Sequence, residues 1–139
     1  MHKLQKVQNS AARLILSRRR RDSAKDALRE LHWLNVETRI TFKILLLVHK
    51  VVRGKAPEGL ALNYKGFNGR PEDLFKLEEP VLKTKYGKRL FAYNGPKLWN
   101  ALPVKLRMEE DTEKYKKNLK TILFDGHDEL KRNTFKYRT

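Results

Sequence analysis

Apolar residues recur every three or four positions near the N-terminus, and this spacing predicts amphipathic helices. The first helix is expected over residues 3–16, with an apolar face made of Leu4, Val7, Ala11, Leu14 and Ile15. A second, short helix is expected after Asp22 or Ser23, because both residue types cap helix N-termini well. A cluster of arginines separates these two helices.

The longest apolar stripe follows Asn35, a residue type that favours the N-cap position. A third helix is therefore expected from Asn35 to about Arg53, with Gly54 at its C-terminal end. Its stripe includes Leu47 and is widened by Phe42, Leu45 and Leu46. This width predicts that the third helix is the central and most buried one.

No period survives in residues 57–80, where glycine, proline and asparagine recur, so an irregular loop is expected there. Two extended runs, residues 81–85 and 88–93, flank Tyr86 and Gly87 and predict a β-hairpin. A short helix containing Trp99 is then expected to begin at Asn94.

A last helix is expected from Asp111 or Thr112 to Asp125, followed by Gly126. The expected fold class is mostly α: a small helical bundle of three N-terminal helices with a long loop, one β-hairpin and a C-terminal helix. The length of 139 residues suits a single domain. The predicted core residues are Trp33, Phe42, Leu47, Phe91 and Trp99.

Composition and turn signals divide this domain into four regions. These are a basic helical region at 1–56, the irregular loop at 57–80, the hairpin, tryptophan helix and C-terminal helix at 81–124, and a basic flexible tail at 125–139.

The formal net charge of +16 indicates a polyanionic partner, either nucleic acid or an anionic membrane surface. Most of the excess positive charge lies in residues 1–54. The chain has no cysteine and its four histidines are scattered, so no metal, disulfide or cofactor is expected. The longest apolar run, Ile44–Val48, is too short to span a membrane. With no apolar signal segment at the start, an intracellular location, nuclear or cytoplasmic, is expected.

Two groups of basic residues are candidates for binding phosphates, since guanidinium groups match phosphate oxygens and stay charged. One surrounds the arginine block; a solvated linker or a nuclear-import signal is the alternative. The other surrounds the predicted hairpin, where an aromatic side chain could stack on a base; a charged edge strand is the alternative. The candidates are Arg13, Arg18, Arg19, Arg20, Arg21, Lys25, Lys83, Lys85, Tyr86, Lys88 and Arg89.

Several blocks, in order along residues 4–124, resemble one family of mobile-element proteins. The first runs Leu4-Gln5-Lys6-Val7-Gln8-Asn9 and continues to Leu14; later ones include Leu28-Arg29-Glu30-Leu31-His32-Trp33 and Gly95-Pro96-Lys97-Leu98-Trp99-Asn100. They are similar to the segment that follows the polymerase core in non-LTR (LINE-type) retrotransposon reverse transcriptases of the chicken-repeat group.

The resemblance implies a thumb-associated extension that helps to hold template RNA or primer during target-primed reverse transcription. The family's polymerase motif needs paired aspartates for two metal ions, and this chain has no Asp-Asp pair. A non-catalytic fragment lacking the polymerase core is therefore expected, with RNA, possibly DNA, and the missing polymerase domain as partners. The alternatives are a structural tail or degenerate remnant without independent function, and a basic module that binds acidic proteins or membranes.

Overall fold

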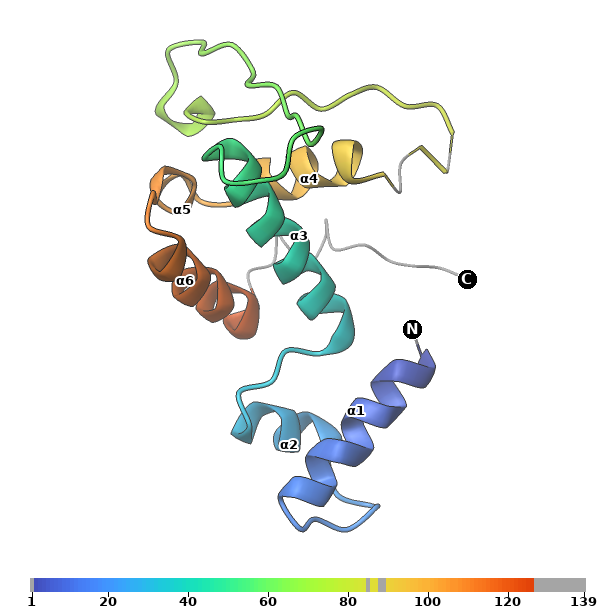
Figure 1. The fold of residues 1–139 in the computed structure, drawn as a ribbon. Helices are drawn as coiled ribbons and strands as arrows, with labels where there is room; N and C mark the ends of the chain where they lie inside the picture. The colour runs from blue at the N-terminus through green and yellow to red at the C-terminus, as the bar shows by residue number, and fades with distance from the viewer. Residues whose placement is uncertain (1, 85, 88–89, 127–139) are drawn as a thin grey trace. The chain divides into compact units, whose positions relative to one another are not determined.

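The computed structural model describes residues 2–84, 86–87 and 90–126, and most of them are helical (Figure 1). The helices are α1 (His2–Ile15), α2 (Ala24–Glu30), α3 (Val36–Val52), α4 (Phe91–Asn100), α5 (Val104–Met108) and α6 (Thr112–Asp125), with a 3-10 turn at Pro71–Asp73. In these residues the only β-type pairing is one antiparallel bridge between Tyr64 and Leu77. The predicted mostly-α fold class is confirmed.

The chain separates into two compact units within α3, between Ile40 and Thr41. Unit 1 comprises the described residues before this point, and unit 2 comprises those after it. The regions expected from composition stay a prediction. Most of the expected tail, residues 127–139, lies outside the described residues.

Three helix caps lie where the sequence places them, whereas Asn94, expected at the start of the tryptophan helix, lies inside α4. The side chains of Ser23, Asn35 and Asp111 each accept a hydrogen bond from a backbone N–H in the first turn of α2, α3 and α6. Such a bond satisfies one of the backbone donors that a helix start leaves unpaired. Gly54 and Gly126 follow α3 and α6 with φ of 66° and 77°, the left-handed conformation that commonly ends a helix.

Unit 1 is held together by a small contact between α1 and α2. Ala12 of α1 and Ala27 of α2 are fully buried, with Leu28 beside them. Because alanine is small, two helices can approach closely at these positions. Leu16, Leu31 and Trp33 pack around the cluster and are partly buried.

Two glutamines of α1 bind the backbone just before and at the start of α3. Gln8 Nε2 donates to the carbonyl of Leu34 at 2.9 Å, and Gln5 Oε1 accepts from the N–H of Val36, also at 2.9 Å. These bonds satisfy backbone groups at a helix entry, as a capping side chain does. The face of α1 that packs within unit 1 is therefore made of alanine, leucine and glutamine. It differs from the predicted apolar face, whose residues Leu4, Val7, Leu14 and Ile15 are exposed.

The core of unit 2 is an aromatic cluster from three helices. His49 of α3 stacks on Tyr115 of α6 with ring centroids 4.1 Å apart, and Trp99 of α4 lies 6.0 Å from Tyr115 and 6.4 Å from His49. All three side chains are fully buried. The polar atoms of Trp99 and Tyr115 find backbone partners: Trp99 Nε1 donates to Phe75 O at 2.8 Å, and the Tyr115 hydroxyl donates to Leu45 O at 3.3 Å.

Helices α3 and α4 cross closely at Gly95. A Cβ atom placed on Gly95 would lie 3.0 Å from Cγ2 of Val48, a contact tighter than side chains normally make. Gly95 thus allows the backbone of α4 to reach the surface of α3, which brings Trp99 into the aromatic cluster.

Of the other predicted core residues, Phe42, Leu47 and Phe91 are partly buried.

The segment between α3 and α4 is irregular, as expected, but side chains anchor it. Arg107 of α5 is 2% exposed, and its guanidinium donates to the carbonyls of Leu74 and Glu72 at 2.7 Å each. Asn100 of α4 accepts from the N–H of Leu77 at 2.8 Å and donates to the carbonyl of the same residue at 2.9 Å. The side-chain amide pairs with this backbone as a neighbouring strand does.

The predicted β-hairpin is wrong. Its second arm was expected over residues 88–93, but Phe91 begins helix α4, a full turn before the predicted start at Asn94. The described residues 81–84 have no strand partner within the described chain. The reason is that Phe91 belongs to a helical row with Gly95 and Leu98, whereas Leu90 to Tyr93 form a short apolar run whose pattern alone does not distinguish a strand from a helix. Lys85, Lys88 and Arg89 lie outside the described residues.

Replacing Trp99 by alanine is expected to lower the free energy of unfolding by roughly 3–5 kcal/mol, because it leaves a large cavity in the aromatic cluster. Urea denaturation followed by circular dichroism measures the loss. Trp33→Ala is the matched control and should cost less, since Trp33 is only partly buried. If the two variants lose the same stability, Trp99 is not the centre of the core.

The imidazole of His49 makes stability depend on pH. Its Nε2 donates to Glu109 O at 2.9 Å, so Nδ1 carries no proton in the neutral ring, and Nδ1 has no partner in the described chain. Burial lowers the pKa of His49 below 6.5. Below pH 6.5 the unfolded chain then binds a proton that the folded chain does not, so stability falls as pH falls.

We expect the free energy of unfolding of the wild type to decrease between about pH 6.5 and about pH 5, and that of His49→Gln to decrease less over the same window. Denaturation at several pH values measures both. Leu47→Ala serves as a control that weakens packing on the same helix while keeping the imidazole, so it should retain the wild-type pH dependence. If the free energies of unfolding of the wild type and of His49→Gln changed equally with pH, the pH dependence would not come from His49.

Candidate nucleic-acid interface

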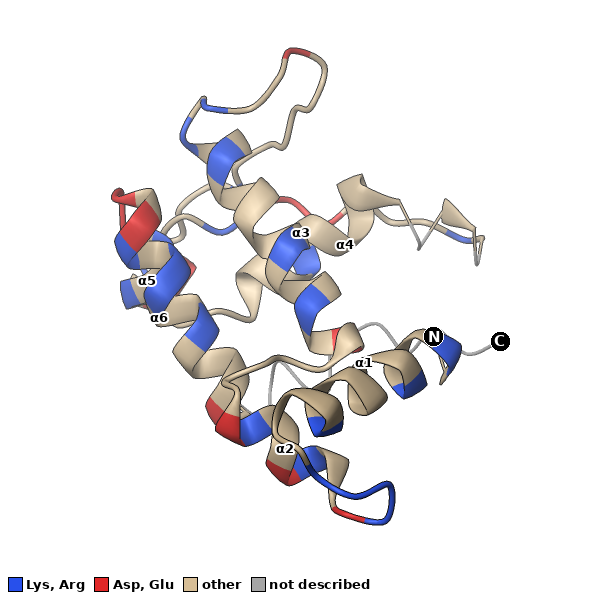
Figure 2. Ribbon diagram, turned by 60° about the horizontal axis from the view of Figure 1, so that its bottom comes forward, with Lys and Arg blue, Asp and Glu red and all other residues tan. Residues whose placement is uncertain are grey.

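The arginine block forms the connection between α1 and α2, which we call the basic turn (residues 17–22). Figure 2 shows this connection as a nearly continuous stretch of basic residues. Arg19, Arg20 and Arg21 are exposed, and Arg18 is partly exposed. The turn therefore concentrates guanidinium groups at one end of unit 1.

Backbone and side-chain hydrogen bonds fix the course of the basic turn. Ser17 has a left-handed φ of 52°, and the N–H of Arg18 donates to Arg13 O at 2.8 Å, which ends α1. Asp22 then closes the turn from both sides: its carboxylate accepts from the N–H of Arg19 at 2.7 Å, and its own N–H donates to Arg19 O at 3.0 Å. The backbone that carries the arginines is thus held by the residue that follows them.

Arg13, predicted to bind phosphate, also supports the turn. Its Nε donates to the carbonyl of Asp22 at 2.9 Å. Arg18 forms an ion pair with Glu30 at the end of α2, and the two side chains are 28% and 54% exposed. This pair supplies the compensating charge that a run of four arginines calls for. Within the described residues, no ion pair is found for Arg19, Arg20 or Arg21.

Helix α2 extends the positive surface. Lys25 and Arg29 are both exposed and lie four residues apart, so they share one face of the helix. Of the two, Lys25 was among the residues predicted to bind phosphate. The predicted binding residues of unit 1 are thus brought together by a turn and one helical face, with Arg13 and Arg18 acting partly as supports.

The second predicted group is not assembled in the same way. Lys83 and Tyr86 are exposed, with Tyr86 81% accessible, and both belong to unit 2. The hairpin that was expected to hold them is absent from the described residues, so the alternative of a charged edge strand also loses its basis there.

Sequence reasoning missed a row of lysines on α6. Lys114, Lys117 and Lys120 are exposed, while Tyr115 and Leu119 of the same helix are buried. A neighbouring lysine, at position 116, pairs with the carboxylate of residue 113 at 3.6 Å. The sequence did contain a signal for this row. The lysines are three residues apart, and they lie between the apolar positions of the predicted last helix.

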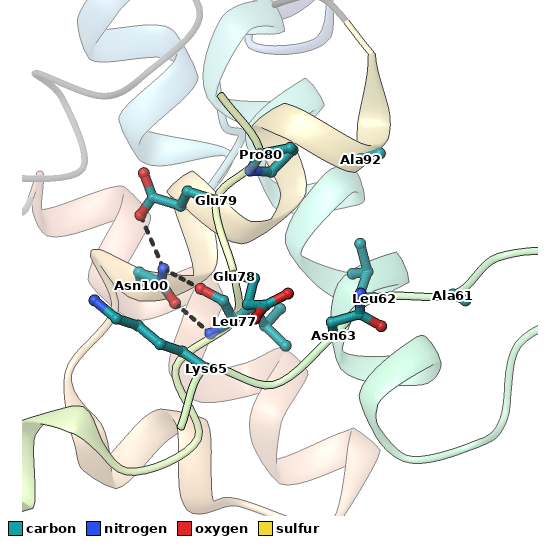
Figure 3. Close-up of a pocket in the computed structure, with 10 residues that line it drawn as sticks. All are labelled: Ala61, Leu62, Asn63, Lys65, Leu77, Glu78, Glu79, Pro80, Ala92 and Asn100. Carbon is teal, nitrogen blue, oxygen red and sulfur yellow. Dashed lines mark hydrogen bonds between the residues drawn. The ribbon is translucent and has the colours of Figure 1, made fainter. Parts of the chain in front are cut away.

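A hollow of about 720 Å³ lies beside the anchored segment of unit 2 (Figure 3). Its polar side chains already serve the fold: Asn100 binds the Leu77 backbone and also donates to Glu79 Oε1 at 2.8 Å. Asn63, Lys65 and Glu78 complete the polar lining. This set offers no nucleophile with an adjacent base, so the hollow supports no particular reaction.

No group of three or more histidine, aspartate or glutamate residues in the described part of the chain could hold a metal ion. Every helix in that part is too short or too polar to cross a lipid bilayer.

Comparisons with protein-family models, with curated proteins and with solved structures find no match.

Replacing Asp22 by alanine is expected to loosen the basic turn, because the N–H of Arg19 loses its acceptor. Backbone ¹⁵N relaxation should show larger fast motions for Arg19 to Arg21, and unfolding should cost about 0.5–2 kcal/mol less, as for a lost helix cap. Asp26→Ala is the control, since it removes the same charge from α2 without touching the turn. Unchanged relaxation in Asp22→Ala would show that the turn is held by other contacts.

Proposed function

We propose that this chain is a non-catalytic nucleic-acid-binding segment, with RNA as its main ligand. The observation that carries the proposal is the basic turn, in which Asp22 fixes the backbone and Arg19, Arg20 and Arg21 project from the surface without carboxylate partners in the described chain. We further propose that it is an accessory part of a non-LTR retrotransposon reverse transcriptase without its polymerase core.

The energetics of the turn favour phosphate as the partner. Adjacent guanidinium groups repel one another, and only Arg18 has an ion-pair partner among the described residues. A polyphosphate backbone relieves this repulsion and accepts charge-assisted hydrogen bonds from each guanidinium.

The binding mode that follows is independent of sequence. Guanidinium groups that contact phosphates position a protein on nucleic acid but carry no information about the bases. The net charge of +16 adds a long-range attraction that salt screens. The choice of RNA over DNA is supported by the resemblance of the chain to the post-polymerase segment of reverse transcriptases, and the absence of an Asp-Asp pair supports the non-catalytic role.

The variant Arg19→Gln, Arg20→Gln, Arg21→Gln tests the basic turn. We expect weaker binding to two unrelated RNAs by similar factors, and a slope of log K against log salt that is shallower by about 2, since each lost contact with single-stranded RNA removes about 0.7. Fluorescence anisotropy over a salt series measures both quantities.

The matched control, Lys43→Gln, Lys50→Gln, Lys105→Gln, replaces three exposed lysines of unit 2 and removes the same charge. It should change the slope less than the arginine variant does. If the two variants reduce the slope equally, binding depends on the overall charge and the basic turn is no site. If the arginine variant leaves the slope unchanged, the turn does not contact phosphate.

A further inference from the structure

Helix α1 carries an apolar stripe that the described residues of its own unit leave uncovered. Leu4, Val7, Leu14 and Ile15 are 61%, 67%, 80% and 57% exposed. The contact with α2 uses another side of the helix, on which Ala12 is fully buried. Aliphatic side chains so exposed in a contiguous row along one helix indicate a docking surface.

The spacing of the stripe fits another helix. Leu4, Val7, Ala11 and Leu14 are separated by three, four and three residues, the a and d spacing of two heptads. Between Val7 and Leu14 the small side chains of Ser10 and Ala11 leave a shallow apolar hollow along the helix. Side chains that alternate with a hollow in this way can receive the ridge of a partner helix.

The charges around the stripe select the partner. Helix α1 has no acidic residue, and Lys3 and Lys6 lie along one edge of the stripe. The other edge is closed by Gln8, whose amide binds the carbonyl of Leu34 within unit 1. Carboxylates on a partner would therefore meet cations along one side only. A second copy of this chain would bring two positively charged helices together, which charge repulsion opposes.

We propose that the stripe on α1 binds an amphipathic helix of a partner protein, with aliphatic residues at its contact positions and glutamate or aspartate along its flank. An anionic membrane is a poorer fit. Helices that lie on membranes carry a broad apolar face with aromatic anchors. The stripe on α1 is narrow, has no tryptophan or tyrosine at its edges, and has cations on one side only.

This surface is separate from the proposed nucleic-acid surface. The stripe contains no basic residue, and the basic turn begins only after the end of α1. Partner binding and RNA binding can therefore be removed independently. The failure of one proposal leaves the other intact.

The test uses the full chain and a synthetic acidic peptide of about three heptads, with leucine at the a and d positions and glutamate at e and g. Isothermal titration calorimetry at about 0.15 M salt measures its affinity. A peptide of the same composition in scrambled order controls for charge alone. The variant Val7→Gln, Leu14→Gln should bind at least about tenfold more weakly while keeping its helix content and its RNA affinity, because both side chains are largely exposed.

The matched control is Phe67→Gln, Val81→Gln, which removes two exposed apolar side chains of unit 2 and should leave peptide binding unchanged. Equal binding of the ordered and scrambled peptides, or equal binding by the stripe variant and wild type, would overturn the proposal. Sedimentation that shows a dimer lost in the stripe variant would assign the surface to a second copy. If the wild type bound anionic lipid vesicles but not the peptide, and the stripe variant lost the vesicle binding, the surface would be assigned to a membrane.

Discussion

The buried guanidinium of Arg107 is the interaction on which unit 2 depends. A buried charge is costly unless hydrogen bonds surround it, and here backbone carbonyls of the irregular segment and of the α4–α5 connection supply them. The same bonds position Phe75, whose carbonyl receives the indole N–H of Trp99 and whose ring lies 5.7 Å beneath Arg53. Arg53 in turn donates to the carbonyls of Arg107 and Glu109. One cation therefore fixes the loop, and the loop completes the aromatic core.

The parts of the fold that depend on local signals could be predicted. Ser23, Asn35 and Asp111 were identifiable as caps because a capping bond involves residues two or three apart. The start of α4 was misread because Leu90 to Tyr93 are all apolar, and a short apolar run fits a strand as well as a helix. Only the row continued by Gly95 reveals the helical period, and the value of that glycine depends on a contact with Val48, far away in the sequence.

The candidate nucleic-acid interface also has parts that the sequence could predict and parts that it could not. Consecutive arginines are visible in any sequence, so the basic turn was found, and so were Lys25 and Arg13. The pairing of Arg18 with Glu30 and the closure of the turn by Asp22 were not predicted, since they require the chain to reverse between two helices. The exposure of the stripe on α1 was equally hidden: an amphipathic pattern shows that a face is apolar, but not whether the chain itself covers it.

The anchoring of the irregular segment has a consequence for hydrogen exchange. The N–H of Leu77 is bound by the Asn100 side chain, and the N–H of Lys65 by the carbonyl of Lys76, although neither residue belongs to a helix. The amide of Leu77 can exchange with solvent only when the segment separates from α4. Its protection therefore follows the packing of the helices. A segment that resembles a surface loop in sequence thus opens as part of the same cooperative unit as the aromatic core.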